Sequence, residues 1–314
     1  MISVLFSGDP DKRSQYGDAV SKAAKAAGLQ LRLSLDPAEV APEVVEYLIY
    51  DGSGPVQDFT PFTRLRGVMN LWAGVEAVLR CPAPPDLQIA RMIEPGLTEG
   101  MRDYVIGHVM RHHLDVDRYI GTEPITEWEV TFPPLARNRT VGILGIGTLG
   151  ADCAAHLAGL GFNVLGWSRS AKEIAGVTCL SGDQGLEDLI AAAEILVLLL
   201  PHTAETERVL NADRLAALPE GACIVNAGRG PLIDHDALLA ALDRGHIRHA
   251  TMDVFDVEPL PPEHPYWSHP KVTVTPHIAS VTRPETASEA IVANIRRDQA
   301  GQPMLGIVQR TRGY

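Results

Sequence analysis

The chain has 314 residues, of which 46% are hydrophobic and 21% are charged, so it is long enough to bury two apolar cores. Its 39 acidic and 27 basic side chains give a formal net charge of −12, which disfavours a polyanion such as nucleic acid as a partner. The strongest apolar run, residues 195–200, is far shorter than the roughly 20 residues that cross a bilayer, so no membrane partner is expected.

The cysteines and the N-terminus indicate a reducing, cytoplasmic compartment. None of the four cysteines stands in a C-x-x-C pair, so neither a metal site nor a disulfide framework is expected. Three of them, Cys153, Cys179 and Cys223, lie in apolar segments typical of a core, and the fourth is Cys81. Residues 1–11 lack the basic start and the long apolar run of a secretory signal peptide.

The first part of the chain alternates short apolar runs with helical patterns, which predicts a parallel sheet covered by helices. A helix is expected at residues 11–27, ending at Gly28, and a longer one at residues 102–119. Residues 121–139 are rich in proline and are expected to form an extended arm or linker. Strands are expected at residues 2–6, 29–33, 44–50, 67–71 and 87–92.

The second part of the chain repeats this alternation with runs that are mostly continuous and apolar, as in strands buried on both faces. Helices are expected at residues 234–245 and 284–300, and another is indicated by apolar residues on one helical face, namely Leu149, Cys153, Leu157 and Leu160. Strands are expected at residues 140–144, 163–167, 195–200, 222–226, 250–254 and 272–275. The predicted fold class is therefore α/β, with two doubly wound parallel-sheet domains.

A glycine-rich motif directly follows the first strand of this second series. Residues 140–150 read T-V-G-I-L-G-I-G-T-L-G, a G-x-G-x-x-G motif between a strand and a helix. Gly145 permits the tight turn, Gly147 lets the backbone approach a pyrophosphate, and Gly150 lets the helix pack close to the strand. With Thr148 and Leu149, the motif presents helix N-terminal N–H groups to phosphates. It predicts a dinucleotide site, and a glycine-rich turn without a ligand is the alternative.

The residues after the next strand indicate which dinucleotide is bound. Ser168, Arg169 and Ser170 stand where an acidic residue would meet the 2′-hydroxyl of NAD, and Lys172 lies just beyond. An arginine flanked by serines favours the 2′-phosphate of NADP through charge-assisted hydrogen bonds. NADPH is therefore the expected preferred cofactor. NADH is the alternative if Arg169 is only a solvated loop residue.

Three polar side chains, Arg229, Glu258 and His277, come just past the ends of three later strands, where ligands bind in doubly wound sheets. Hydride transfer to a 2-oxo acid needs a cation for the carboxylate, which suits Arg229, and a proton donor, which suits His277. A carboxylate such as Glu258 orients an imidazole and favours its charged form. Each residue alone is typical of a surface or structural position, but the set of three indicates an active site.

These motifs resemble those of the D-isomer-specific 2-hydroxyacid dehydrogenase family over nearly the whole chain. The resemblance is carried by residues 145–150, 226–230, 253–259 and 275–277. It is closest to the glyoxylate/hydroxypyruvate reductase A branch, through residues 167–170, 258–262 and 312–314. By this resemblance Arg229 and His277 are catalytic and Glu258 supports His277. Further cofactor contacts implied by it are Pro201, Thr203, Ala227 and Asp253.

The resemblance also implies a domain arrangement and a partner subunit. A flavodoxin-like substrate domain, residues 1–101 and 284–314, is expected to hold an inserted Rossmann dinucleotide-binding domain, residues 102–283. Because the family's arm contacts a second subunit, a homodimer is expected, with Trp128 at the contact. The alternative for Trp128 is packing within its own chain.

The loop at residues 70–76 is implied to bind the substrate carboxylate. A loop of small residues between a strand and a helix exposes backbone N–H groups to an anion, which agrees with that role. The expected substrate contacts, besides Arg229 and His277, are Trp72, Ala73, Gly74 and Val75. Trp72 is bulkier than the residue expected in this branch, so it either narrows the pocket or packs as an ordinary apolar side chain.

The expected function is the reduction of glyoxylate, hydroxypyruvate or a similar small 2-oxo acid to the D-2-hydroxy acid with NADPH. One alternative is a nucleotide-sensing binding protein, similar to the corepressor members of the family, which would not need Arg229, Glu258 and His277 all intact. Another is an NAD-linked dehydrogenase of larger 2-hydroxy acids, which an acidic residue in place of Arg169 would favour.

Overall fold

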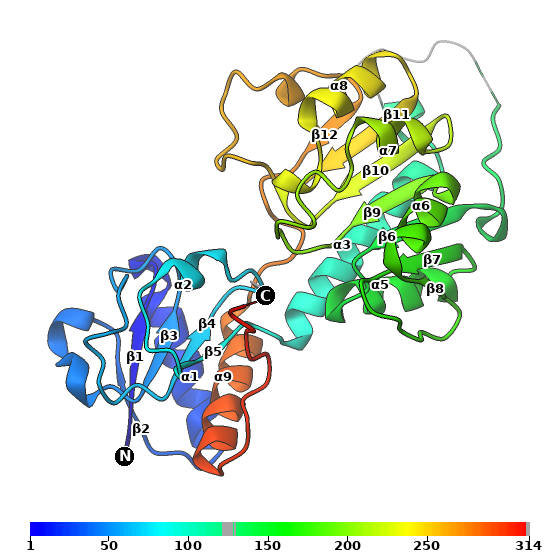
Figure 1. Cartoon of the computed structure of the whole chain (residues 1–314). Coiled ribbons are helices and arrows are strands. Elements are labelled where there is room, and N and C mark those ends of the chain that lie inside the picture. Colours follow the sequence, from blue (N-terminus) through cyan, green and yellow to red (C-terminus); the bar gives the residue numbers. More distant parts are fainter. Residues whose placement is uncertain (121–127, 129, 312–314) are drawn as a thin grey trace. The chain divides into compact units, whose positions relative to one another are not determined.

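The computed structural model describes residues 1–120, 128 and 130–311, and it divides into two compact units (Figure 1). Unit 1 comprises Met1–Leu97 and Val281–Tyr314, and unit 2 comprises Thr98–Ser280, so the second unit is inserted in the sequence of the first. Residues 121–127 and 129 of the expected arm, and residues 312–314, lie outside the described residues. In the described part of the chain, no helix combines the length and apolarity that a bilayer crossing demands.

Unit 1 is built on a five-stranded parallel sheet with the strand order β2-β1-β3-β4-β5, as in flavodoxin-like folds. The strands are β1 (Ile2–Ser7), β2 (Leu31–Ser34), β3 (Tyr47–Tyr50), β4 (Gly67–Asn70) and β5 (Gln88–Ala90). Successive residues of β1 point to opposite faces, so Val4 and Phe6 enter one apolar cluster and Leu5 enters the other. Both faces of the sheet are therefore covered.

Helices and loops of unit 1 cover the two faces of its sheet. Helices α1 (Arg13–Ala26) and α9 (Pro284–Gln299) pack beside each other over one face, as Figure 1 shows in blue and red. The short helix α2 (Glu76–Arg80) and the surrounding loops cover the other face, where Val78 is buried. The first unit also contains the 3-10 turns Pro10–Lys12, Pro37–Glu39 and Pro42–Val44.

Unit 2 is built on a seven-stranded parallel sheet with the order β12-β11-β10-β9-β6-β7-β8. Its strands are β6 (Thr140–Leu144), β7 (Asn163–Trp167), β8 (Thr178–Leu180), β9 (Ile195–Leu198), β10 (Ala222–Asn226), β11 (Ile247–Met252) and β12 (Val272–Val274). The chain order reverses between β6 and β9, which is the switch point where doubly wound sheets bind ligands. The predicted α/β class with an inserted Rossmann-type sheet is confirmed.

Helices cover both faces of the second sheet and leave its strands buried. Helices α3 (Pro95–His113) and α5 (Thr148–Gly159) pack on one face. The other face is covered by α6 (Gly182–Ala192), α7 (Ala212–Ala217) and α8 (His235–Asp243). The remaining helical segments of this unit are α4 (Asp117–Ile120), η4 (Ala136–Asn138), η5 (Gly230–Leu232) and η6 (Pro265–Trp267).

The helix predicted at residues 102–119 was wrong at both ends. Helix α3 already begins at Pro95, because the side chain of Glu94 accepts hydrogen bonds from the N–H groups of Gly96 and Leu97 at 2.6 and 2.7 Å. This acts as an N-terminal cap, and proline suits the first helical turn. The helix stops before Asp115, whose positive φ of 53° interrupts the helical path, and the chain resumes as α4.

One further prediction in unit 2 needed correction, and three elements of this unit were not predicted. The strand expected at residues 250–254 spans Ile247–Met252, because Ile247 and the polar His249 pair with Ala222 and Cys223 of β10. The short edge strand β8 and the helices α6 and α7 were not predicted. Strand β8 has only three residues, none of them buried, so it lacks a periodic apolar pattern.

Candidate active site

The glycine-rich turn after β6 has the shape that a dinucleotide pyrophosphate requires. Gly145 adopts φ +104°, a conformation that side chains disfavour, and a Cβ on Gly150 would lie 2.0 Å from the carbonyl oxygen of Gly145. A Cβ on Gly147 would meet nothing within 4 Å, so open space adjoins the backbone there. Gly147 is the N-cap of α5, and no side chain in the described ranges caps that helix end, which begins with Thr148 and Leu149.

A second set of cofactor candidates lies after β7, at the neighbouring strand end. The Ser168 hydroxyl donates to the carbonyl oxygen of Ser170 at 2.7 Å, which folds the loop around Arg169. The pKa of Glu205 is lowered, mainly by a hydrogen bond with Thr203, and also by the charge of Arg169. Arg169 therefore lies near the loop after β9, where the sequence placed other cofactor contacts.

Lys172 adds a second cation to this edge. Its ammonium group donates to the carbonyl oxygen of Ile146 at 2.8 Å, within the glycine-rich turn itself. The sequence showed only that Lys172 follows Arg169, and its contact with the turn appears only in the fold. Together, Arg169 and Lys172 supply the positive charge that a phosphorylated nucleotide needs.

The loop after β9 is fixed by a threonine that sequence reasoning missed. The Thr206 hydroxyl donates to the carbonyl oxygen of Pro201 at 2.7 Å and accepts from the N–H of Thr203 at 2.8 Å. These bonds hold Pro201 and Thr203, two predicted cofactor contacts, in one turn. Thr206 belongs to the same T-A-E-T segment as Thr203, so its spacing of three residues was the available signal.

Arg229 follows β10 and is carried by a turn built around Asn226. The fully buried amide of Asn226 donates to the carbonyl oxygen of Arg229 at 3.0 Å and accepts from the N–H of Gly228 at 3.1 Å. The predicted cofactor contact Ala227, which is buried, lies inside this turn and donates its N–H to Leu198 of β9. Asn226 thus sets where the partly exposed Arg229 side chain leaves the sheet.

His277 and Glu258 are brought together by the structure. The Nδ1 atom of His277 lies 2.7 Å from Oε2 of Glu258, and Oε1 of Glu258 accepts from the N–H of Phe255 at 2.9 Å. The His277 side chain is half exposed, so the pair lies at the surface of unit 2 and is open to a ligand. The arrangement orients the imidazole and places a negative charge beside it.

Asp253 holds the backbone that presents His277. Its fully buried carboxylate accepts from the hydroxyl of Thr275 at 2.6 Å and from the N–H groups of Ile278 and Ala279, both at 2.9 Å. His277 has a positive φ of 53°, a strained conformation for a residue with a side chain, at a cost on the order of 1–2 kcal/mol. The three bonds to Asp253 maintain that strain. The carboxylate of this predicted cofactor contact is thus engaged within its own unit.

The predicted substrate loop, residues 70–76, lies in unit 1 and follows β4. The buried Asn70 amide donates to the carbonyl oxygens of Trp72 and Gly74 at 2.8 and 2.7 Å, which shapes the loop. The Trp72 ring is partly exposed, and the ammonium group of Lys12 lies 4.9 Å above its centre. Ala73 lies between these residues, and Val75, which is buried, caps the start of α2.

The fold and the glycine-rich turn define the class of this protein, a dinucleotide-dependent enzyme with an inserted Rossmann-type unit. The comparisons then specify the family. Residues 105–279 match the family model "D-isomer specific 2-hydroxyacid dehydrogenase, NAD binding domain". This chain belongs to the D-isomer specific 2-hydroxyacid dehydrogenase family, and it is an oxidoreductase.

Relatives of known name and structure agree with this assignment. The chain is 41% identical over 256 residues to the glyoxylate/hydroxypyruvate reductase A of Yersinia enterocolitica, which covers 80% of this chain and 82% of the relative. A D-isomer specific 2-hydroxyacid dehydrogenase from Xanthobacter autotrophicus Py2, solved with NADPH and MES, is 40% identical over 99% of both chains, with a TM-score of 0.92. An NADPH-dependent glyoxylate/hydroxypyruvate reductase from Sinorhizobium meliloti, solved with NADP and sulfate, is 32% identical over the full length of both chains, with a TM-score of 0.88.

Proposed function

We propose that this protein reduces glyoxylate, hydroxypyruvate or a similar small 2-oxo acid to the D-2-hydroxy acid, with NADPH as the preferred cofactor. The observation that carries the proposal is the hydrogen bond of 2.7 Å between His277 and Glu258, at the strand edge that also presents Arg229. Relatives named glyoxylate/hydroxypyruvate reductase, and related structures that contain NADPH or NADP, support the substrate and the cofactor.

The residues around the glycine-rich turn fit a nicotinamide dinucleotide. Gly147 leaves space beside the backbone, and the N-terminus of α5 faces that space with its N–H groups. The pyrophosphate would be held there, and Arg169 with Ser168 and Ser170 would hold the 2′-phosphate. When bound, the nicotinamide ring supplies the hydride that reduces the substrate carbonyl.

The protein's own groups perform the rest of the reaction. The Arg229 guanidinium binds the substrate carboxylate and polarises the adjacent carbonyl. His277 delivers a proton from Nε2 to the carbonyl oxygen as the alkoxide charge develops, because its Nδ1 is engaged by Glu258. Glu258 keeps the imidazole oriented and favours the charged form that holds this proton. In unit 1, backbone N–H groups of residues 72–75 bind the substrate carboxylate.

A rate screen tests the substrate and the cofactor together. The purified protein is assayed with NADPH and with NADH against glyoxylate, hydroxypyruvate, pyruvate and phenylpyruvate. We expect the highest kcat/KM for one of the first two acids with NADPH. A preference for phenylpyruvate with NADH would instead support the NAD-linked dehydrogenase of larger acids, and no turnover with any acid would support the binding-protein alternative.

A variant of Arg169 tests the preference for NADPH over NADH. A charge-assisted hydrogen bond to the 2′-phosphate is worth on the order of 1.5–3 kcal/mol. Arg169→Ala should therefore raise the KM for NADPH roughly tenfold or more and leave the KM for NADH nearly unchanged. Equal changes for both cofactors would show that Arg169 does not contact the 2′-phosphate.

We also propose that the chain forms a homodimer through the segment that follows α4. The described part of this segment exposes large apolar side chains to solvent, namely Trp128, Val130, Phe132 and Leu135. Exposed apolar side chains grouped in this way mark protein interfaces. Sedimentation equilibrium should give a dimer for the native chain and a monomer for the double variant Trp128→Ser and Phe132→Ser. A native monomer would remove this proposal.

Action in the cytoplasm, expected from the isolated cysteines, is part of the same proposal. Cys81, Cys153, Cys179 and Cys223 are free cysteines in the structure.

A further inference from the structure

The loop that carries Glu258 runs from β11 to η6 and is only partly held by burial. Phe255 is buried and its ring lies 6.4 Å from that of Tyr266, but Val257 is exposed and the side chains of Asp256 and Glu258 reach solvent. An exposed loop of this kind moves unless other contacts restrain it. The position of the Glu258 carboxylate, and so its distance from His277, depends on those contacts.

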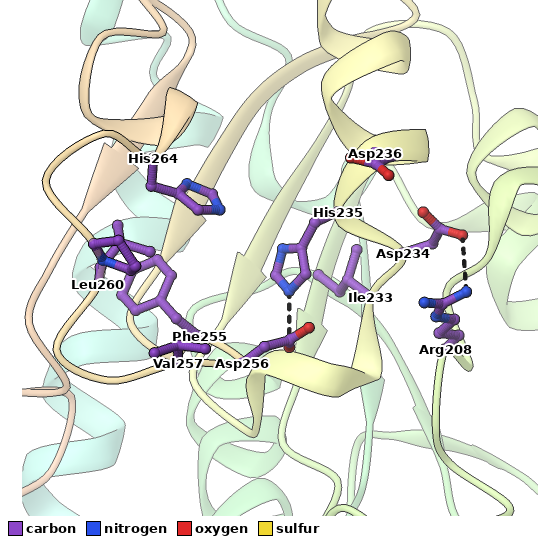
Figure 2. A pocket seen from close by; sticks show the side chains of 11 residues that line it. Arg208, Ile233, Asp234, His235, Asp236, Phe255, Asp256, Val257, Leu260 and His264 are labelled. Carbon is purple, nitrogen blue, oxygen red and sulfur yellow. Dashed lines mark hydrogen bonds and ion pairs between the residues drawn. The ribbon is translucent and has the colours of Figure 1, made fainter.

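Asp256 provides such a contact, through a residue of α8. Figure 2 shows the His235 ring reaching from the start of α8 to the Asp256 carboxylate. Both side chains line a cavity of about 300 Å³. The Nε2 atom of His235 lies 3.0 Å from Oδ1 of Asp256, and its Nδ1 atom lies 2.7 Å from the hydroxyl of Tyr266. Tyr266 is almost fully buried and belongs to the core of unit 2. These contacts therefore link the Glu258 loop to the buried Tyr266.

The two contacts of His235 give its ring one orientation. A carboxylate can only accept, so Nε2 carries the proton that is donated to Asp256. Burial raises the pKa of Tyr266 far above its usual value, so its hydroxyl keeps its proton and donates to Nδ1 of the neutral ring. In the charged ring, Nδ1 donates to the same hydroxyl instead. The contact with Asp256 is thus kept in both protonation states.

The backbone of the Glu258 loop is also packed against Gly230. A Cβ at this position would lie 2.1 Å from the carbonyl carbon of Phe255 and 2.4 Å from the nitrogen of Asp256. The backbone that follows Arg229 therefore touches the peptide that precedes Asp256, with no room for a side chain. Gly230 thus contacts the backbone of the Glu258 loop, and His235 contacts the side chain of Asp256 in the same loop.

We infer that His235 is a positioning residue: through Asp256 it fixes the loop that presents the Glu258 carboxylate to His277. This inference rests on the roles of Glu258 and His277 in the proposed function. His235 itself touches neither substrate nor cofactor. Its effect reaches the reaction only through the distance and angle of the contact between Glu258 and His277, which set how well the charged imidazole is stabilised.

Several described elements place charged and titratable groups around His235 and His277. Near His235 they are Asp256 and His264 from the loop after β11, Tyr266 from η6, Arg208 from the loop before α7, and Asp234 and Asp236 from its own helix end. Around His277 they are Glu258, Asp253 through the backbone, and Tyr104 of α3 through Thr275. Among these, the hydrogen bond between His235 and Asp256 joins the Glu258 loop to α8, and His235 in turn contacts the buried Tyr266.

The test is the pH dependence of kcat/KM for glyoxylate with saturating NADPH. Removing the carboxylate in Glu258→Gln should move the alkaline limb of the reductive profile to lower pH by on the order of one unit. His235→Ala and Asp256→Ala should each move it in the same direction by a smaller amount. His235→Gln, which keeps a donor near Nε2, should restore most of the native profile.

A double variant shows whether His235 acts through Glu258. In the Glu258→Gln background, His235→Ala should move the limb no further, because the contact that it supports is already lost. Asp236→Asn is the matched control, since it removes a charge from the same cavity wall but not from the contact with the loop. It should leave the profile unchanged.

The outcomes separate this inference from the proposed function. If Glu258→Gln moves the limb and His235→Ala lowers only the melting temperature, His235 is merely structural and the inference fails. If Glu258→Gln itself leaves the limb in place, the proposed role of Glu258 fails. If His235→Ala moves the limb equally in both backgrounds, His235 acts on His277 by another route and the inference is again overturned.

Discussion

Unit 2 places histidines in two contrasting environments. His277 lies in a loop after β12, half exposed, with Nδ1 at 2.7 Å from the Glu258 carboxylate. His112 of α3 and His249 of β11 are largely buried, with ring centres 5.3 Å apart, and their Nε2 atoms contact the hydroxyls of Thr251 and Thr273. The same side chain is thus held by a charge at one place and by neutral hydroxyls at the other.

Burial decides the protonation of the second group. The pKa of His112 is lowered to about 2, mainly by desolvation and also by the nearby positive groups. Desolvation also lowers the pKa of His249, to about 4, although Asp117 acts in the opposite direction. A carboxylate 3.7–3.9 Å from both Nδ1 atoms does not offset the cost of burying a charge. A histidine that donates protons therefore needs both a contacting carboxylate and access to solvent.

The largest test of this comparison is the loss of His277. A positioned general acid contributes typically 10²–10⁴-fold to a rate, so His277→Ala should lower kcat for glyoxylate reduction by about that factor. The buried histidine supplies the control, because His112→Gln keeps a hydrogen-bonding group for Thr251 and should leave kcat nearly unchanged. Steady-state kinetics with NADPH measures both. Comparable losses of kcat in the two variants would mean that exposure and a contacting carboxylate do not distinguish a catalytic histidine from a structural one.

A smaller effect is expected from Arg229 at the same strand edge. Arg229→Lys keeps the charge but loses the planar fork that matches a carboxylate. The KM for glyoxylate should rise and kcat should fall, with a combined loss in kcat/KM of roughly tenfold or more, because a charge-assisted hydrogen bond is worth on the order of 1.5–3 kcal/mol. The Kd for NADPH, measured by fluorescence, should stay the same. Near-native kcat/KM would exclude Arg229 from the substrate site.

Much of the carboxyl edge of the unit 2 sheet could be predicted from the sequence, because the patterns that specify it lie within short segments. The strands at residues 140–144, 163–167 and 222–226 were predicted with the observed bounds, since each is a continuous apolar run between turn residues. The glycine-rich turn was recognisable because Gly145 and Gly150 occupy positions where only glycine fits. In these segments, propensity, pattern and packing all favour the same structure.

Other features depend on individual hydrogen bonds that the apolar pattern of the sequence does not reveal. The positive φ of His277 rests on Asp253, and the turn that carries Arg229 rests on the buried amide of Asn226. Both residues belong to motifs of the sequence, but their supporting role was not predicted. The early start of α3 rests on Glu94, a residue type uncommon as a helix cap. The buried histidines were not predicted either, because a polar side chain on a helix face normally indicates a solvated position.

The smallest expected effect is the contribution of the buried histidines to stability against pH. The folded-state pKa of His112 is lowered, to about 2, from an unfolded value of about 6.5. Below pH 6.5 the unfolded chain therefore binds a proton that the folded chain does not, so stability is present above pH 6.5 and is lost as the pH falls toward the folded pKa. One such group contributes a slope of about 1.4 kcal/mol per pH unit to the free energy of unfolding.

Replacing His112 by glutamine should remove that slope and retain the contact with Thr251. Urea unfolding of the native chain and of His112→Gln between pH 7 and pH 4.5 measures the free energy of unfolding directly. We expect the native chain to lose stability more steeply by about one proton, and the two curves to run parallel above pH 7. His277→Gln is the matched control, since a half-exposed histidine beside a carboxylate should not steepen the acid loss. Equal slopes for the native chain and His112→Gln would mean that His112 does not stay neutral in the folded protein, and the contrast between the two environments would then fail.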